Sequence, residues 1–426
     1  MINAKKRIKE NKAITLVALV VTIVVLIILA GITLSLVLGQ SGIVNKAKEA
    51  RDKTQADKLN TELAMNTLYD QMEGTISGTG SIYSNIDLTK TNPLATQPAG
   101  STLIETDGNK GITIKDANGN EWVWIEVPKT ATVYPTAGLA ITSFTDAEYT
   151  SIENDLHTYT NTYRNGTIFV DEWYDSKGAK KDTSTNLSDT AGCGVNSADY
   201  TNIKNAMLKS VYQNGGFWVG RYEVGDATST TSNTTRTSST GYTDTAVIKA
   251  DQHPYDYISC DHAENLASKF APSGKNSSLL FGVQWDLVLR YLESKGVTQA
   301  ELKTDSTSWG NYVNANFDIV KGMYNVVDTS NVTLTTWISA GSKYTKASNS
   351  CILLTTGATD RNSKMNIYDL AGNVWEWTME YTSNVSIPCT IRGARYGNDG
   401  GTPASFRNNF FTATTNDYMG FRVALY

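Results

Sequence analysis

The sequence predicts an α+β protein in two parts, a long N-terminal transmembrane helix followed by a globular domain of mixed helices and strands. An uninterrupted apolar run at residues 14–38 indicates the first part. Alternating patterns at 121–127 and 216–224, typical of strands, and helical patterns at 261–270 and 284–295 indicate the second. With 426 residues, of which 40% are hydrophobic and 19% charged, the chain can bury a large core.

The apolar run is long enough to span a bilayer. It contains about 25 uncharged, mostly apolar residues, which at about 1.5 Å per residue cover a hydrocarbon core of roughly 30 Å. A basic leader at residues 1–13 precedes it, which predicts a cytoplasmic N-terminus and an extracellular remainder. Apolar residues continue at helical spacing to Leu68, so we expect a transmembrane and amphipathic helix over residues 14–73.

The stretch from Lys12 to Ala30 resembles the amino terminus of type IV prepilins and pseudopilins. In that family a prepilin peptidase cleaves after a small residue just before the apolar run, which implies cleavage here between Ala13 and Ile14. The exposed helix would then pack against other pilin subunits. Ala13 stands where the family usually has Gly, and Ala18 where major pilins carry Glu, so an uncleaved single-span anchor remains the alternative.

Two stretches have the composition of loops. Residues 74–110 are rich in Gly, Ser, Thr, Asn and Pro, and we expect them to form a linker before a globular domain over residues 111–426. Residues 226–240 form a second polar tract and predict an exposed loop.

Charge and cysteine content exclude some function classes. The net charge of −5 provides no electrostatic footprint for nucleic acid, so we expect no nucleic-acid partner. The cysteines are widely separated and form no CxxC pair, which argues against zinc. Outside the cell disulfides are permitted, but the sequence does not choose among the three full pairings of Cys193, Cys260, Cys351 and Cys389.

Residues 366–378 form the most specific motif of the globular part and read NIYDLAGNVWEWT. This motif resembles the core of formylglycine-generating-enzyme-like (sulfatase-modifying factor) domains, which share a C-type-lectin-like fold. The resemblance implies that fold from Trp122 to the C-terminus. Further segments follow in the family's order, namely 217–224, 253–263, 279–286, 392–396 and 420–425.

The same motif suggests a calcium site. Trp375 and Trp377 would share one face of a strand and bury large area, and Gly372 permits a tight turn before Asn373. In related enzymes this loop binds calcium through oxygens at positions matching the side chains of Asn373 and Glu376 and the backbone of Ala371 and Val374. The alternative is that Asn373 and Glu376 satisfy buried backbone donors.

We expect no enzymatic activity and no redox cofactor. Formylglycine generation by family members uses copper and two neighbouring cysteines, and the corresponding segment here, residues 397–410, contains no cysteine. The iron site of related sulfoxide synthases needs a histidine spacing that His157, His253 and His262 lack. A membrane-tethered oxidative enzyme remains the alternative.

The segment between the last two matched strands is rich in Tyr, Asn, Ser and Arg, as are antibody paratopes. It resembles the variable regions that diversity-generating retroelements mutate in some relatives, although an ordinary polar loop has a similar composition. We expect its polar and aromatic residues to bind ligand. They are Arg395, Tyr396, Asn398, Asp399, Thr402, Ser405, Arg407, Asn408, Asn409, Asn416 and Tyr418.

Together these patterns predict a pilin-anchored adhesin or receptor at the cell membrane and cell surface. Its C-terminal loops would bind an extracellular protein or glycan. A structural minor pilin that binds no ligand is the further alternative.

Overall fold

The computed structural model describes residues 82–164, 171–172, 194–227, 245–272, 274–328, 333–334, 336–382 and 387–426. The chain divides after Ser81, and these residues all belong to the second unit, Ile82–Tyr426. The predicted leader, the transmembrane helix and the cleavage site at Ala13 and Ile14 lie outside the described residues. Within the described ranges, no helix combines the length and apolar character needed to cross a membrane.

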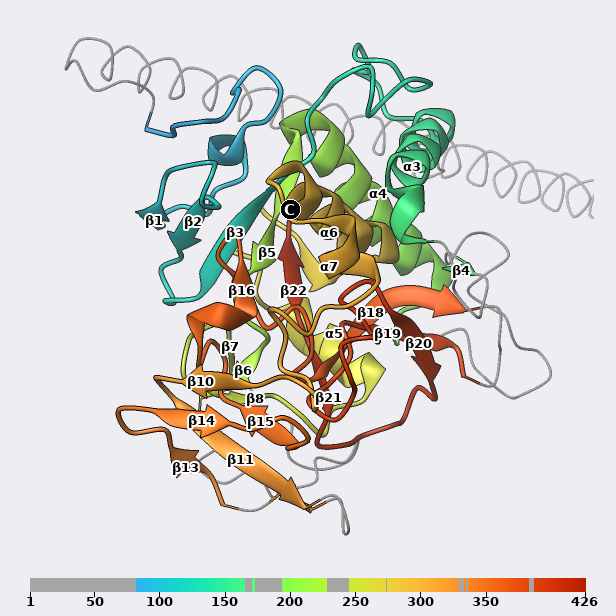
Figure 1. Cartoon of the computed structure of the whole chain (residues 1–426). Helices are drawn as coiled ribbons and strands as arrows, with labels where there is room; N and C mark the ends of the chain where they lie inside the picture. Colours follow the sequence, from blue (N-terminus) through green and yellow to red (C-terminus); the bar gives the residue numbers. More distant parts are fainter. Residues whose placement is uncertain are drawn as a thin grey trace, which may run out of the picture. The chain divides into compact units, whose positions relative to one another are not determined.

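The largest sheet in the described part of the chain has six strands in the order β1-β2-β3-β5-β22-β9. All neighbouring strands in it are antiparallel. The C-terminal strand β22 lies between β5 and β9, so the end of the chain is held inside the sheet (Figure 1). The strands are β1 (Thr102–Glu105), β2 (Thr113–Lys115), β3 (Glu121–Glu126), β5 (Gly216–Gly220), β9 (Ser277–Leu279) and β22 (Val423–Leu425).

A second sheet carries the motif strand. Its order is β20-β19-β18-β21, with β4 also paired to β18, and β18 and β21 run parallel. Trp375 and Trp377 on β18 are both buried, which confirms the predicted packing role of the two indoles. The strands are β4 (Asp171–Glu172), β18 (Trp375–Thr382), β19 (Cys389–Arg392), β20 (Arg407–Phe410) and β21 (Met419–Phe421).

Short strands form smaller sheets, and Figure 1 shows those between β10 and β15 grouped at the opposite end of this unit from α3 and α4. β10 pairs with β14, β11 with β12, β13 and β15, β16 with β17, and β6 with β7 and β8. The bounds are β6 (Gly225–Asp226), β7 (Ala246–Val247), β8 (His253–Pro254), β10 (Phe317–Ile319), β11 (Met323–Asp328), β12 (Thr333–Leu334), β13 (Ile338–Ser339), β14 (Tyr344–Lys346), β15 (Ile352–Leu354), β16 (Ser363–Lys364) and β17 (Ile367–Tyr368).

The described helices pack on these sheets. α6 contacts α3, β3 and β18, and α5 contacts β9 and β18. The helices predicted at 261–270 and 284–295 are confirmed as α5 and α6, each beginning one or two residues earlier. α3, α4 and α7 were not predicted. The bounds are η1 (Pro93–Ala95), α3 (Asp146–Thr160), η2 (Asn161–Tyr163), α4 (Ser197–Asn214), α5 (Cys260–Ala267), α6 (Gly282–Ser294), α7 (Gln299–Lys303) and η3 (Asp360–Asn362).

Residues 82–110, assigned to a linker by composition, are folded into this unit. They include β1 and η1, and Tyr83 is only 2% exposed. The hydroxyl of Thr91 accepts the indole N–H of Trp124 at 2.9 Å, and the hydroxyl of Thr96 accepts that of Trp218 at 3.1 Å. Polar residues therefore occur here because they satisfy core tryptophans, and the folded unit begins well before residue 111.

Two matched segments differ from the expected strands. Of residues 392–396 only Arg392 belongs to a strand, because Gly393 and Ala394 have positive φ angles (84° and 67°) and turn the chain out of β19. Residues 420–425 form parts of β21 and β22, separated by Arg422. Most of the polar tract at 226–240 lies outside the described residues.

Candidate functional site

The turn at Gly372 and Asn373 is fixed by tight backbone packing. Both residues have positive φ angles, and a Cβ atom on Gly372 would lie 2.2 Å from the carbonyl oxygen of Asn311, so only glycine fits. The Asn373 side chain is buried. Its Oδ1 accepts the Leu354 N–H and the Asn311 amide, both at 3.0 Å, and its amide donates to Glu223 at 2.7 Å. This side chain therefore holds three segments together.

A second feature behind this turn is a buried group that we call the carboxylate-rich cluster, formed by Glu223, Asp369, Glu376 and Arg422. The Arg422 guanidinium donates to both oxygens of Glu376, at 2.7 and 3.0 Å. Burial raises the pKa of Asp369 to about 6, and burial with the charges of Asp369 and Glu376 raises the pKa of Glu223. Since the carboxylates outnumber the guanidinium, this cluster takes up protons at a higher pH than isolated carboxylates do.

These residues do not fit a calcium ion. Both oxygens of Glu376 face the Arg422 guanidinium, which would repel a cation placed between them. The Asn373 Oδ1 and the Ala371 carbonyl already accept protein N–H groups. Asn373 therefore satisfies buried hydrogen-bonding groups, as in the alternative prediction, whereas Glu376 forms an ion pair with Arg422.

The residues predicted to bind ligand divide into buried and accessible sets. Tyr396, Ser405, Arg407 and Asn409 are at most 8% exposed, so the expectation that these side chains are displayed is wrong. They are buried because their polar groups pair inside the fold. Asp399 is exposed, and the rest of the set is half-buried, namely Arg395, Asn398, Thr402, Asn408, Asn416 and Tyr418.

Arg407 belongs to a buried group that we call the arginine-rich cluster, formed by Asp286, Glu380, Arg164, Arg392 and Arg407. Asp286 on α6 lies 2.8 to 3.0 Å from the guanidinium nitrogens of all three arginines. Glu380 on β18 lies 2.7 to 3.5 Å from the same three groups. Burial alone would raise the pKa of Asp286, but the arginines outweigh it and the pKa is lowered.

Tyr396 anchors the opposite end of the segment. It is fully buried, and its hydroxyl donates to the Asp417 carboxylate at 2.7 Å. It packs in a small apolar cluster with Val327, Trp337 and Leu353. Position 396 is thereby joined to position 417, which fixes the backbone on both sides of the segment.

Beside this anchor lies a half-buried group formed by Arg395, Asn416, Tyr418 and Tyr257. We call it the ligand patch, after the ligand binding that the sequence predicts for the first three of these residues. The Arg395 guanidinium lies 4.2 Å from the Tyr418 ring centroid, a cation–π contact. The Asn416 amide donates to the Tyr418 hydroxyl at 2.9 Å, and the Tyr257 N–H donates to the Asn416 carbonyl at 2.9 Å. The patch therefore presents a tyrosine ring stacked with a guanidinium, next to an asparagine whose backbone holds a second tyrosine.

The sequence reasoning missed Tyr257. It has a φ angle of 51°, a strained conformation for a bulky residue that is often found at binding sites. Burial, together with the charge of Asp417, raises the pKa of Tyr257 to about 12, so its hydroxyl is neutral at physiological pH. Its place in the family-like segment 253–263 was visible in the sequence, but its proximity to Asn416 depends on the tertiary fold.

The remaining candidate redox residues are spread through the domain. His253 is 7% exposed and stacks on Trp337 with ring centroids 4.1 Å apart, so it packs inside the fold. His262 is half-buried in the first turn of α5, and its Nδ1 lies 2.8 Å from the Ser259 hydroxyl. Cys260, Cys351 and Cys389 are free thiols, and Cys193 lies outside the described residues. Within the described ranges, no group of His, Cys, Asp and Glu is arranged to hold a metal ion.

Comparison with protein families gives a match over residues 194–426 to the Sulfatase-modifying factor enzyme 1-like domain, which covers more than half of the chain. The chain belongs to this family. The match confirms the resemblance carried by residues 366–378 and the C-type-lectin-like fold that it implies. The sulfatase-modifying-factor family includes enzymes and non-enzymatic members, so membership leaves activity open. The comparisons lend no support to the pilin-like N-terminus, which stays a prediction.

Among solved structures, this sulfatase-modifying-factor-like chain is similar to PvdO from Pseudomonas aeruginosa, at 16% identity and a TM-score of 0.27, over 50% of this chain and 81% of that one. Treponema denticola variable protein 1 matches at 13% identity and a TM-score of 0.19, over 52% and 67%. CarF matches at 13% identity and a TM-score of 0.21, over 71% and 85%. Comparison with curated proteins finds no match. Similarity at this level does not bear on function.

Proposed function

We propose that this protein is a ligand-binding receptor or adhesin whose ligand patch binds an extracellular protein or glycan. The observation that carries the proposal is the ligand patch itself, where Arg395 stacks on Tyr418 beside Asn416 and Tyr257. Tyr, Asn and Arg are the residue types that recognition surfaces favour, because they combine rigid aromatic area with adaptable hydrogen bonds.

The patch is supported by a fixed backbone. Tyr396 and Asp417 tie the two sides of the segment together, and the buried Arg407 secures its middle. A binding surface that is already ordered loses less conformational entropy when it meets its ligand. The buried residues of the segment therefore act as positioning residues, and the half-buried ones are available for contact.

The absence of cysteine from residues 397–410 supports binding over chemistry, because the related enzymes need two neighbouring thiolates there. We propose accordingly that the protein does not chemically transform its ligand.

We further propose that residues 14–73 hold the domain at the cell surface, after cleavage between Ala13 and Ile14 by a prepilin peptidase. This part of the proposal rests on the apolar run and the basic leader. N-terminal sequencing of the mature protein tests it, since an N-terminus at Ile14 is expected and an intact leader would contradict cleavage.

Diversification of the segment by a retroelement is proposed from its composition. Sequencing the 3′ end of the gene across a population tests it. Adenine-directed variation at the codons for Arg395, Asn416 and Tyr418, with the codons of buried Tyr396 and Arg407 unchanged, is the expected result. Invariant codons throughout would leave a receptor of fixed specificity.

The binding proposal is tested with the double variant Arg395→Ala, Tyr418→Ala. Full-length protein in a sugar-free detergent is screened on a glycan array and against an array of extracellular proteins. At least one ligand found for the parent should be lost in the double variant, because the stacked pair is removed.

The matched control is Arg290→Ala, Tyr159→Ala, which removes a cation–π pair of 4.9 Å from a different surface. This control should keep the ligands. If every ligand of the parent is retained by both double variants, the ligand patch is not a binding site, and an array without any signal would contradict the receptor function.

A further inference from the structure

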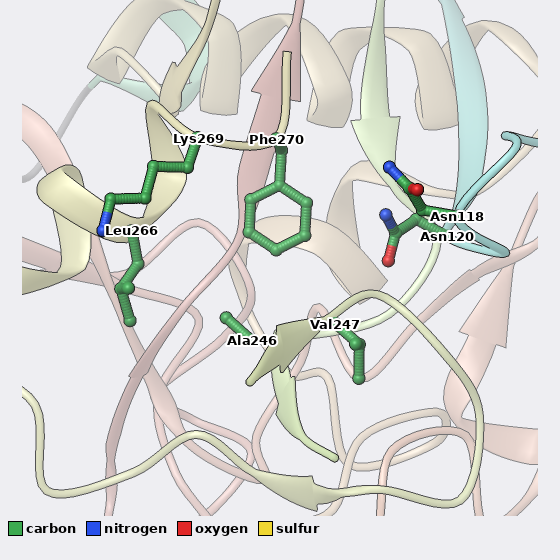
Figure 2. Close-up of a pocket in the computed structure, with 7 residues that line it drawn as sticks. All are labelled: Asn118, Asn120, Ala246, Val247, Leu266, Lys269 and Phe270. Atoms are coloured by element: carbon green, nitrogen blue, oxygen red, sulfur yellow. The ribbon is translucent and has the colours of Figure 1, made fainter. Parts of the chain in front are cut away.

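A cavity of about 340 Å³ opens between the β2–β3 turn, β7 and the end of α5, and the sequence patterns did not point to it. Figure 2 shows the Phe270 ring at its centre, with the amides of Asn118 and Asn120 directed toward the ring from one side. Ala246 and Val247 lie below the ring in this view. Leu266 and Lys269 complete the described lining.

The walls of this cavity are held in place by their own contacts. Asp116 accepts the side-chain amide of Asn120 at 3.2 Å and the indole N–H of Trp122 at 3.0 Å, which fixes the β2–β3 turn. The Asn120 Oδ1 accepts the Ile248 N–H at 2.9 Å. Phe270 packs edge-on against Trp122, with ring centroids 6.1 Å apart. The cavity is therefore built before any ligand arrives.

Two groups in the cavity have surface left for a ligand. Phe270 is half-buried, and Asn118 is exposed. The Asn118 backbone N–H donates to Asp116, whereas its side-chain amide makes no hydrogen bond to the described part of the chain. An aromatic ring beside an amide offers an apolar face together with one acceptor and two donors.

We infer that this cavity binds a single pyranose ring of a glycan. A pyranose has a face of C–H groups that suits the Phe270 ring, and its hydroxyls both donate and accept hydrogen bonds, as the Asn118 amide does. The apolar lining from Leu266, Ala246 and Val247 suits the same C–H groups. The volume lies near the lower end of the range of small-ligand pockets, which fits one sugar ring.

The charge of the lining separates this ligand from other classes. The described lining contains no carboxylate, and this disfavours a cation as ligand. It contains a single ammonium group, that of Lys269, among four apolar residues, and one positive charge is too little for a phosphate-rich ligand. A neutral polyhydroxylated ring meets both conditions. The site goes beyond the proposed function, because its residues are separate from those of the ligand patch.

The test is saturation-transfer-difference NMR on the full-length protein in a sugar-free detergent, with the methyl glycosides of glucose, galactose, mannose and N-acetylglucosamine as probes. At least one probe should receive saturation, most strongly at the protons of one ring face. Phe270→Ala should abolish the signal, whereas Phe270→Tyr should retain it because the ring face remains.

Asn118→Ala should raise the dissociation constant of the sugar about fivefold, the effect of losing one hydrogen bond. Its matched control is Asn109→Ala. Asn109 is exposed in an equivalent turn, where its N–H bonds to Asp107 at 2.9 Å as that of Asn118 bonds to Asp116 at 2.9 Å. The control should bind as the parent does.

Three outcomes would overturn the inference. The first is that none of the four probes receives saturation. The second is that the probes bind Asn118→Ala and Phe270→Ala as they bind the parent. The third is that binding is lost in the Arg395→Ala, Tyr418→Ala variant. The last result would assign the sugar to the ligand patch. Conversely, pyranose binding that survives in that variant would support this cavity even if the ligand patch proposal failed.

Discussion

The two buried charged clusters of this domain have opposite balances. Among the described residues, the arginine-rich cluster has three guanidinium groups around two carboxylates, and the carboxylate-rich cluster has three carboxylates around one guanidinium. The pKa of Asp286 is lowered in the first, whereas the pKa of Asp369 is raised to about 6 in the second.

The difference shows that the C-terminal part of the chain, from β19 to β22, is held by two ion-pair clusters of opposite charge balance. Arg392 and Arg407 bring β19 and β20 against α6, and Arg422 brings the link between β21 and β22 against β18. Three residues of the ligand patch, Arg395, Asn416 and Tyr418, lie between Arg392 and Arg422 along the chain. The first cluster needs its carboxylates ionised, and the second is relieved when a carboxylate is protonated.

The largest effect is expected from Asp286→Ala. It leaves three guanidinium groups, two of them buried, with Glu380 as their one shared carboxylate, which should lower the free energy of unfolding by about 3 to 5 kcal/mol. Urea titration followed by tryptophan fluorescence measures this. Asp318→Ala removes the exposed pair with Lys343 and should lower the free energy of unfolding far less, because solvent screens this pair. Equal losses in the two variants would show that the arginine-rich cluster is not an anchor.

Arg422→Met comes next and should destabilise by about 3 kcal/mol at pH 8, because it removes the cation that offsets Glu376. The loss should be smaller at pH 5, where the cluster's carboxylates can take up protons. The same titration at the two pH values measures it. A loss that does not change with pH would indicate that Arg422 acts through packing alone.

Asp369→Asn tests the sign of the pH dependence. The folded-state pKa of about 6 exceeds the ordinary value of 3.8, so the unfolded chain releases this proton first. Stability should therefore fall as pH rises from about 4 to about 6, by roughly 2 to 3 kcal/mol for this group.

The asparagine variant should lose that slope and keep the hydrogen bond from the Gly357 N–H. The pKa of Asp286 is lowered, so its ionised form stabilises the fold at high pH and this contribution is lost on acidification. Asp286→Asn should therefore remove a rise of stability with pH, whereas Asp369→Asn removes a fall. Unfolding titrations between pH 2 and pH 8 compare the two, with the effect of Asp286→Asn expected below about pH 4 and that of Asp369→Asn between about pH 4 and pH 6. Slopes of the same sign would contradict the comparison of the clusters.

Arg395→Ala, Tyr418→Ala should change stability by only about 1 kcal/mol, because the pair is half-exposed and lies outside both clusters. Its effect should fall on ligand binding. A loss as large as that of Asp286→Ala would make the pair a structural element.

The smallest effect is expected from chelation. EDTA should leave the melting temperature unchanged, because Glu376 is paired with Arg422 and Asn373 with protein groups. Differential scanning fluorimetry with and without added calcium measures this. A fall in melting temperature with EDTA would restore the calcium site.

Much of the fold could be predicted from local pattern. The strands β3, β5 and β18 and the helices α5 and α6 were predicted because their apolar residues recur at the period of each element. α3 was missed because it buries only two apolar residues, Ile152 and Leu156, so its periodicity is weak. α4 was missed although it buries five apolar residues at helical spacing, Tyr200, Met207, Leu208, Val211 and Tyr212. Residues 82–110 were misjudged because composition does not reveal that Thr91 and Thr96 bond to core tryptophans.

The candidate site also has features that local sequence predicts and features that depend on residues distant in the chain. By itself the sequence determined the family, through residues 366–378, and located the segment between the last strands, because both depend on residues adjacent in the chain. Only the tertiary structure decided which side chains of that segment are accessible. Arg407 is buried because Asp286, 121 positions away, pairs with it, and Tyr257 joins the ligand patch through Asn416. Burial depends on such distant partners, and a local pattern does not contain them.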